Sequence, residues 1–266
     1  MIAPTVMKLG GAVVEDPQSA GGLLEAIAQV AASRPLVVLH GGGKAVDRLL
    51  GALKFEVRRV DGLRVTPPDQ MDIIAGVLAG TVNKRVTGGL LARGVRAVGL
   101  CLGDGGAVPT RRLRADLGLV GEVVSDGSAA SAPLLTILLA SGFTPVLSSI
   151  GMDAAGGLLN VNADDAAAGV ARLLGAKELV LLTDVPGVLR RDGSVAGELD
   201  GAQIERMIAG GEITGGMAVK VRAAEAAATA AGAPVTILSG ADPAALAAWA
   251  SGAGSGTRIV PGREKG

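Results

Sequence analysis

The sequence predicts an α/β fold, a three-layer αβα sandwich with a mainly parallel central sheet between two layers of helices. Short continuous apolar runs recur along the 266 residues without polar alternation, as expected of parallel strands that are buried on both faces. Ala- and Leu-rich stretches of helical length separate these runs, and such alternation is typical of βαβ units. A chain of this length can form one domain with a sizeable core.

Seven apolar runs are expected to be strands, and eight stretches between them are expected to be helices. The strands cover residues 5–9, 36–40, 97–100, 144–148, 179–183, 235–238 and 258–260. The helices cover residues 19–32, 44–53, 68–93, 132–141, 164–174, 201–209, 216–231 and 243–250. We expect a single domain over residues 1–266, with an N-terminal lobe (1–175) and a C-terminal lobe (176–266) that divide near Gly175.

Two segments interrupt the alternation and are predicted to be hairpins. Residues 56–65 carry an Asp-Gly dipeptide at 61–62, typical of a tight primed turn, between two short β-prone runs. Residues 152–162 have two glycines at 156–157. Hairpins of this kind do not help to close the core of an α/β fold. They are therefore candidates for lids over a substrate, with surface decoration as the alternative.

The composition excludes several classes of function. Twenty-five basic residues balance 25 acidic ones, so no charge pattern favours a nucleic acid or an anionic membrane. One cysteine and one histidine cannot form an intrachain disulfide or a Cys/His zinc site, and we expect no dedicated metal site. No apolar run approaches the roughly 18–20 residues of a membrane span, and the first residues lack a secretion signal. These features predict a cytoplasmic protein.

Glycine is frequent, with 42 residues, and its clusters follow apolar runs. The clearest clusters are KLGG at 8–11 and HGGGK at 40–44, each at the end of an expected strand. Glycine lets the backbone approach a phosphate and expose N–H groups, and the second cluster also opens a helix, whose dipole favours an anion. Ligands of open α/β sheets bind at these strand ends. An anion site is therefore predicted at these two clusters. The alternatives are that Lys8 only extends into solvent and that residues 40–44 only form a flexible turn. His40 is expected to have a structural role.

Three further polar clusters lie near expected strand ends or helix starts. NVNADD at 160–165 precedes a helix and contains an ordinary N-cap, but Asp164 is also a candidate for orienting lysines near a phosphate. TDVPGV at 183–188 follows an apolar strand at an edge suited to a nucleotide, although its Pro-Gly turn is generic. Lys220 lies in the first turns of a helix, where the dipole disfavours a cation. That conflict is typical of a functional residue, with an exposed, solvated lysine as the alternative.

Taken in order, these motifs resemble the amino-acid kinase superfamily, and within it the N-acetylglutamate kinases of arginine biosynthesis. No single stretch is specific, but the ordered set spans nearly the whole chain. The matching stretches are MKLGG (7–11), HGGG (40–43), DGLRVT (61–66), AGTVNK (79–84), GDGG (103–106), NVNAD (160–164), LLTDVPGV (181–188), GGMAVK (215–220) and GTRIV (256–260).

The resemblance implies phosphorylation of the side-chain carboxylate of N-acetyl-L-glutamate by ATP with Mg²⁺, to give N-acetyl-L-glutamyl 5-phosphate. The N-terminal lobe would bind the acceptor and form the dimer contact, and the C-terminal lobe would bind ATP. Lys8 and Lys220 would neutralise the transferred phosphoryl group, and Asp164 would organise them. The acceptor would be held by Gly42, Gly43, Arg64 and Asn160, and the phosphates by Gly10, Gly11 and Gly41. The nucleotide would be bordered by Thr183, Asp184, Val185, Gly187, Val188, Leu189, Glu212, Ile213, Thr214 and Met217.

The chemistry of the residues agrees with this reaction. A carboxylate is already ionised near neutral pH, so its phosphorylation needs positioning and charge stabilisation but no general base. Two alternatives stay open: a carrier-protein-linked 2-aminoadipate or glutamate kinase of the same fold, and a binding module without turnover, which would not need both lysines. Arginine-inhibited members carry a helix ahead of their first strand. In this sequence the first expected strand begins within the first few residues. We therefore expect an arginine-insensitive homodimer.

Overall fold

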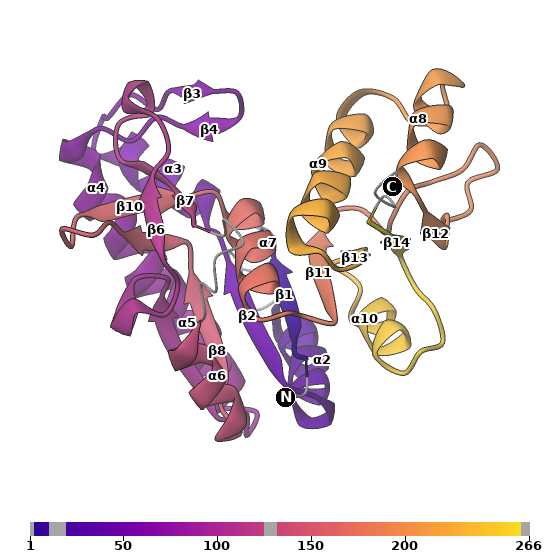
Figure 1. Ribbon diagram of the computed structural model, residues 1–266, viewed down its shortest axis with the longest axis horizontal. Helices are drawn as coiled ribbons and strands as arrows, with labels where there is room; N and C mark the ends of the chain where they lie inside the picture. Colours follow the sequence, from indigo (N-terminus) through magenta and orange to yellow (C-terminus); the bar gives the residue numbers. More distant parts are fainter. Residues whose placement is uncertain (1–2, 11–19, 125–131, 262–266) are drawn as a thin grey trace.

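The computed structural model describes residues 3–10, 20–124 and 132–261 (Figure 1). Its centre is an eight-stranded sheet with the strand order β12-β14-β13-β11-β1-β2-β8-β5. Neighbouring strands are parallel except for β13 and β14, which are antiparallel. The predicted α/β class with a mainly parallel sheet is confirmed.

All seven predicted strands belong to this sheet, and none of their ends differs by more than one residue from the end expected. β2 and β8 are buried along their whole length, which explains why the sequence shows no polar alternation there. β12 was not predicted, because a two-residue strand leaves no recognisable apolar pattern. The strands are β1 (Thr5–Leu9), β2 (Leu36–His40), β5 (Ala97–Cys101), β8 (Thr144–Ser148), β11 (Glu178–Thr183), β12 (Glu198–Leu199), β13 (Val235–Ser239) and β14 (Thr257–Ile259).

Helices cover both faces of the sheet, which makes three layers. Val6 of β1 packs in a core cluster with residues of α6, α7, α8 and α9, whereas its neighbour Met7 packs with α2, α3, α4, α5 and α10. Of the helices that the structure describes, none combines the length and apolar character needed to cross a lipid bilayer. The helices are α2 (Ala20–Ser33), α3 (Gly43–Ala52), α4 (Pro68–Ala75), α5 (Asn83–Leu91), α6 (Pro133–Ala140), α7 (Ala163–Leu173), α8 (Gly201–Ala209), α9 (Gly215–Ala231) and α10 (Pro243–Ala250).

The single helix expected over residues 68–93 has a π-helical segment in its middle. This segment, Gly76–Val82, joins α4 to α5 and contains two glycines, which weaken the regular α-helical arrangement. Its Leu78 is buried and lies against Gly42. The widened turn therefore presses a side chain onto the glycine-rich loop after β2, a relationship that the helical periodicity of the sequence could not reveal.

A second sheet of four strands has the order β6-β7-β10-β9. β9 (Ile150–Met152) and β10 (Leu158–Val161) are antiparallel and form the hairpin predicted at 152–162. β6 (Thr110–Arg112) and β7 (Val120–Val123) were not predicted, since both are short and only partly apolar. β7 pairs with β10 in parallel, so this sheet carries the segment that leads into α7.

The other predicted hairpin, at 56–65, is present as β3 (Arg59–Val60) and β4 (Leu63–Arg64). Asp61 and Gly62 at its turn have φ values of 52° and 80°. Two consecutive positive φ values are those of a primed turn, as the Asp-Gly dipeptide predicts. In Figure 1 this hairpin projects at the top of the molecule, apart from the main sheet.

Candidate active site

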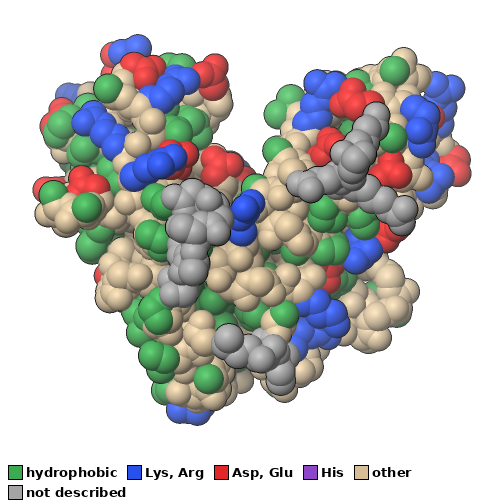
Figure 2. Space-filling view, viewed as in Figure 1, with side chains coloured by type: hydrophobic (Ala, Val, Ile, Leu, Met, Phe, Trp, Pro, Cys, Tyr) green, Lys and Arg blue, Asp and Glu red, His purple; other side chains and the backbone are tan. Residues whose placement is uncertain are grey.

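Three neighbouring parallel strands end together at one edge of the main sheet. Leu9 of β1 lies in register with His40 of β2 and with Leu182 of β11. The segments that follow these strands are therefore adjacent in space, although the sequence separates them widely. Figure 2 shows the molecule hollowed on this side, between the part that carries β3 and β4 and the part that carries α9. Two cavities open there.

The first cavity, of about 280 Å³, lies under the β3–β4 hairpin, and we call it the hairpin cavity. Its polar lining comes from β1, the glycine loop after β2, the hairpin, β10 and the start of α7. The residues that line it include Lys8, Gly41, Gly42, Gly43, Arg59, Arg64, Ser149, Asn160, Asn162 and Asp164.

The second cavity, of about 340 Å³, lies where β1 and β11 end, and we call it the sheet-edge cavity. Its lining combines polar and charged residues with Leu and Ala residues of β11 and α9. The residues that line it include Lys8, Gly10, Lys44, Asp164, Leu181, Thr183, Asp184, Lys220, Ala223 and Ile237.

Lys8 and Asp164 line both cavities, so the two cavities meet at this pair. The Nζ atom of Lys8 lies 2.9 Å from Oδ1 of Asp164, and the lysine side chain is only 14% exposed. The side chain of Asn162 caps α7 by accepting hydrogen bonds from the backbone N–H groups of Asp164 and Asp165, at 2.8 and 3.1 Å. The cap and the ion pair together fix the carboxylate beside Lys8.

The glycine loop after β2 requires glycine at position 42. Gly42 has φ of 154° and is the N-cap of α3, where its carbonyl accepts the first helical hydrogen bond, from Val46. A Cβ at this position would lie 2.8 Å from Cδ2 of Leu78. The sequence therefore brings the backbone of this loop against the π-helical segment at the wall of the hairpin cavity.

His40 holds the same loop from beneath. Its side chain is fully buried, and its Nδ1 lies 2.8 Å from the carbonyl oxygen of Gly41, to which it donates, since a carbonyl can only accept. Nε2 then accepts from the side-chain amide of Asn83, at 3.1 Å. Burial lowers the pKa of His40 to about 4, against the opposing effect of the Gly41 carbonyl. His40 is a neutral, structural residue at neutral pH, as expected from the sequence.

This histidine should make the stability of the fold depend on pH between about 6.5 and 4. The unfolded chain binds a proton at His40 near pH 6.5 and the folded chain only near 4, so stability falls as the pH is lowered through this window. The pKa difference corresponds to about 3 kcal/mol of unfolding free energy. Urea unfolding between pH 7.5 and 4.5 should show a shallower pH slope for His40→Gln than for the unchanged protein. Equal slopes would contradict this role.

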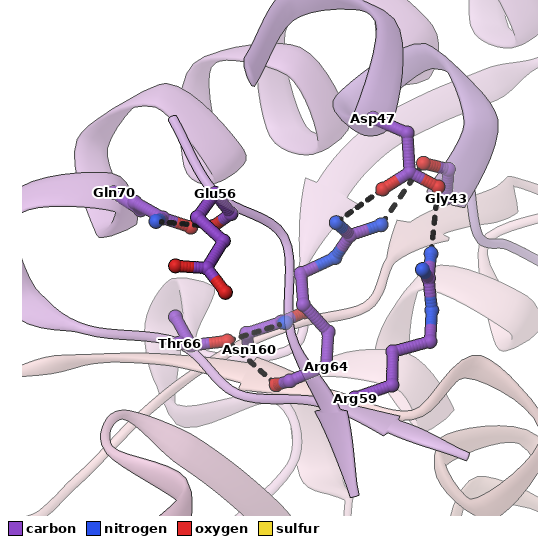
Figure 3. Close-up of polar contacts among 8 residues, drawn as sticks. All are labelled: Gly43, Asp47, Glu56, Arg59, Arg64, Thr66, Gln70 and Asn160. Atoms are coloured by element: carbon purple, nitrogen blue, oxygen red, sulfur yellow. Dashed lines mark hydrogen bonds and ion pairs between the residues drawn. The ribbon is translucent and has the colours of Figure 1, made fainter. Parts of the chain in front are cut away.

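Two arginines of the β3–β4 hairpin meet a carboxylate of α3 (Figure 3). Nη1 of Arg64 lies 2.5 Å from Oδ1 of Asp47, and Nη2 of Arg59 lies 2.6 Å from Oδ2 of the same residue. Arg64 also donates from Nη2 to the carbonyl oxygen of Gly43, at 3.0 Å. Its side chain is 9% exposed, and it is therefore held between the hairpin and the first turns of α3.

Asn160 of β10 is tied to the same hairpin. Its side-chain Nδ2 donates to Oγ1 of Thr66, at 2.9 Å, and Thr66 in turn donates to the backbone carbonyl of Arg64, at 3.0 Å. These contacts are drawn in Figure 3. The amide of Asn160 and the guanidinium of Arg64 thus line one cavity from two different elements.

Both lysines and carboxylates line the sheet-edge cavity. Lys220 of α9 forms an ion pair with Asp184, which follows β11. The hydrogen bond from Lys220 lowers the pKa of the Asp184 carboxyl, and the nearby charge of Lys44 lowers it further. With Lys8 and Asp164 the cavity has three cations and two anions, so its lining carries a net positive charge suited to phosphate groups.

Comparison with known proteins adds an independent observation. The model of the amino acid kinase family matches residues 3–239. The chain belongs to this family. It is 45% identical over 262 residues to an acetylglutamate kinase of Vibrio cholerae and 45% identical over 259 residues to one of Pectobacterium carotovorum, with 97–98% of this chain and 98–99% of each relative covered.

Solved structures share the fold of this amino acid kinase. An N-acetylglutamate synthase of Neisseria gonorrhoeae, complexed with coenzyme A and N-acetyl-glutamate, has a TM-score of 0.81 and 25% identity. The match covers 97% of the kinase chain and 59% of the synthase chain. A protein of Streptococcus mutans UA159 has a TM-score of 0.73 and 30% identity, with 96% and 98% of the two chains covered.

Most site residues expected from the sequence lie on the two cavities of the kinase. The hairpin cavity has Lys8, Gly41, Gly42, Gly43, Arg64, Asn160 and Asp164, and the sheet-edge cavity has Lys8, Gly10, Asp164, Thr183, Asp184 and Lys220. Gly11 lies outside the described residues. The roles of these residues remain predictions.

The other residues expected at the nucleotide line neither cavity. They lie in the loop after β11, between α8 and α9, and in the first turn of α9, and they are Val185, Gly187, Val188, Leu189, Glu212, Ile213, Thr214 and Met217. The side chains of Val188 and Ile213 are buried in the core, at 0% and 2% exposure. Any nucleotide contact of these two residues would therefore be made by the backbone.

Sequence reasoning gave no role to several polar residues around the cavities of this kinase, although Lys44 belongs to the HGGGK cluster. Lys44 and Ser149 line cavities, and Asp47 binds both hairpin arginines. Arg59 could have been found, because the Asp-Gly turn fixes the register and places it opposite Arg64. No sequence signal distinguishes Asp47 from an ordinary solvated helix residue.

Proposed function

We propose that this amino acid kinase transfers the γ-phosphoryl group of ATP to the side-chain carboxylate of N-acetyl-L-glutamate, a step of arginine biosynthesis. The observation that carries the proposal is that two cavities share the Lys8–Asp164 pair, one with an arginine for a carboxylate and one with lysines for phosphates. The 45% identity to acetylglutamate kinases along 98% of the chain supports the same acceptor.

The hairpin cavity holds the acceptor. The guanidinium of Arg64 binds the non-reacting α-carboxylate, for which its planar fork of donors is well matched. The side-chain amide of Asn160 and the backbone N–H groups at Gly42 and Gly43 hold the polar atoms at the other end of the molecule. The cavity volume of about 280 Å³ suits a small amino-acid derivative.

The sheet-edge cavity holds the phosphates of ATP. Lys8, Lys44 and Lys220 supply the positive charge, and Gly10 allows a close approach of the backbone. In this proposal the loop 183–189 and the segment 212–217 border the adenine nucleotide. ATP then belongs to the C-terminal lobe (176–266), and the acceptor belongs mainly to the N-terminal lobe (1–175).

A Mg²⁺ ion fits this cavity when the nucleotide and water supply most of its ligands. Among the described residues no group of three or more His, Cys, Asp or Glu side chains is arranged to hold a metal, and the two carboxylates of the cavity, Asp164 and Asp184, each pair with a lysine. Mg²⁺ commonly binds through one or two carboxylates and substrate phosphates, and it neutralises phosphate charge. Asp184, which is 73% exposed, is the carboxylate best placed to help hold it.

The reaction needs no proton transfer. An oxygen of the acceptor carboxylate attacks the γ-phosphorus, the bond from this phosphorus to the β,γ-bridging oxygen breaks, and ADP leaves with the electron pair. The product is a mixed anhydride, an acyl phosphate. Lys8 and Lys220 stabilise the negative charge on the transferred group, and Asp164 holds Lys8 in place.

The proposal includes a cytoplasmic, arginine-insensitive homodimer. Light scattering coupled to size-exclusion chromatography should give the mass of two chains, and the activity should be unchanged by added L-arginine. A hexamer would contradict this part alone.

Hydroxylamine trapping tests the reaction directly, because an acyl phosphate reacts with hydroxylamine to give a coloured hydroxamate. The protein with ATP and Mg²⁺ should form hydroxamate from N-acetyl-L-glutamate, but not from glutamate, aspartate or 2-aminoadipate. Hydroxamate from a different acceptor would overturn the proposal that N-acetyl-L-glutamate is the substrate. Absence of hydroxamate with all four compounds would leave two explanations, a kinase with a carrier-bound acceptor and a non-catalytic binding module. A titration of ATP binding would distinguish between them.

A further inference from the structure

Arg59 and Arg64 are directly opposite each other on β3 and β4, so their side chains project from the same face of the hairpin. Two like charges at such a position repel each other. The Asp47 carboxylate lies against both, with one oxygen on each guanidinium, at 2.6 and 2.5 Å. This carboxylate comes from α3, a different element, and so it joins the hairpin to a helix of the main domain (Figure 3).

The hairpin is also held by an ion pair from Arg114 to Asp61 at its turn, at 3.5 Å, and by the hydrogen bonds that join Asn160 to Thr66 and Thr66 to the carbonyl of Arg64. β3 and β4 have two residues each and form a sheet of their own, which pairs with neither of the larger sheets. A two-stranded hairpin of this size is marginally stable by itself. The ion pairs to Asp47 and the hydrogen bond from Arg64 to Gly43 are therefore a substantial part of its attachment to α3.

The net charge of Arg59, Arg64 and Asp47 allows one more carboxylate to bind beside them. Two guanidinium groups and one carboxylate carry a net charge of +1. Burial raises the pKa of Asp47, but the hydrogen bonds and charges of Arg64 and Arg59 outweigh this and hold the pKa below its usual value. Asp47 is therefore ionised at neutral pH. One carboxylate from the acceptor would complete the neutralisation of the two arginines.

We propose that Asp47 is a positioning residue for the acceptor, which fixes the guanidinium of Arg64 where it receives the non-reacting α-carboxylate of the substrate. Asp47 does not line the hairpin cavity, whereas Arg59 and Arg64 do, so it acts through the arginines. This inference rests on the proposed function, because it takes the acceptor to be an acidic amino-acid derivative with a second carboxylate.

Replacing Asp47 by asparagine tests the inference, since the amide keeps the size of the side chain and removes its charge. We expect Asp47→Asn to raise the KM for N-acetyl-L-glutamate about tenfold or more, the effect of losing a charged hydrogen-bond partner. The KM for ATP and kcat should change less than about twofold. Asp72→Asn is the matched control, because Asp72 is an exposed carboxylate on α4 outside both cavities, and its kinetics should match those of the unchanged protein.

A second substrate separates positioning from a merely structural role. In the α-amide of N-acetyl-L-glutamate the non-reacting carboxylate is neutral, while the reacting carboxylate is retained. Suppose that Asp47 acts by positioning Arg64 to bind the α-carboxylate. The KM of Asp47→Asn divided by the KM of the unchanged protein should then be about one when the α-amide is the substrate. A structural defect would raise the KM for both acceptors alike, and that result would overturn the inference.

Asp47→Glu provides a second variant in case Asp47→Asn fails to fold. The longer side chain keeps the charge but displaces the carboxylate, and we expect an increase of about threefold in the KM for N-acetyl-L-glutamate, again absent with the α-amide. An unchanged KM in both variants would overturn the inference while the unchanged protein still forms hydroxamate. Failure of the unchanged protein to form hydroxamate would instead overturn the proposed function.

Discussion

Replacing Lys220 by alanine is expected to lower kcat by about 10²–10³-fold without unfolding the protein, because it removes a cation that stabilises the transferred phosphoryl group. Lys220 is on the second turn of α9, where its side chain is 39% exposed and pairs with Asp184 at the sheet-edge cavity. An exposed lysine near a helix N-terminus adds little to stability. The loss should therefore appear in turnover.

Hydroxamate formation with N-acetyl-L-glutamate and ATP measures this loss, and far-UV circular dichroism with thermal unfolding checks the fold. Lys177→Ala is the matched control, because Lys177 is an exposed lysine just before β11, at the end of that strand away from Thr183. The control should keep full turnover. If the Lys220→Ala variant kept more than about a tenth of the original kcat, Lys220 would not have the proposed role in phosphoryl transfer.

The fold class could be predicted because it depends on local patterns. Parallel strands buried on both faces give apolar runs, such as residues 36–40, and nothing beyond a run and its neighbours is needed to recognise them. β6, β7 and β12 depend on pairing instead. β12 has two residues, Glu198 and Leu199, and becomes a strand only because Arg258 and Ile259 lie beside it. Such pairing cannot be inferred from so short a segment.

The candidate site divides in the same way. Glycine clusters at strand ends indicate an anion site from the sequence alone, and the strand register then brings Lys8 and the loop after His40 together. Asp47 depends on tertiary contacts, since its partners are 12 and 17 residues away and on a different element. Lys44 lines a cavity because Gly42 turns the chain sharply at the start of α3. The sequence does not show where that turn points.

Replacing Lys8 by alanine is expected to lower kcat by about 10²–10³-fold, since this lysine lies where the two cavities meet. Asp164→Asn should cause a smaller loss, of about tenfold to 10²-fold, because it removes the partner that holds the ammonium group of Lys8, 2.9 Å away, but leaves the lysine itself. The asparagine can still occupy the first turn of α7, where Asn162 caps the helix, and the fold should persist.

The double variant decides how these two residues act. If Asp164 works through Lys8, removing the carboxylate from a protein that already lacks the lysine should cost nothing further, and Lys8→Ala with Asp164→Asn should be as active as Lys8→Ala alone. Losses that multiply would show instead that Asp164 acts independently of Lys8. Hydroxamate assays on the four proteins, with ATP and acceptor saturating, give the four kcat values. Because Asp164 lines both cavities, only this coupling assigns its contribution to the lysine rather than to the acceptor or the nucleotide.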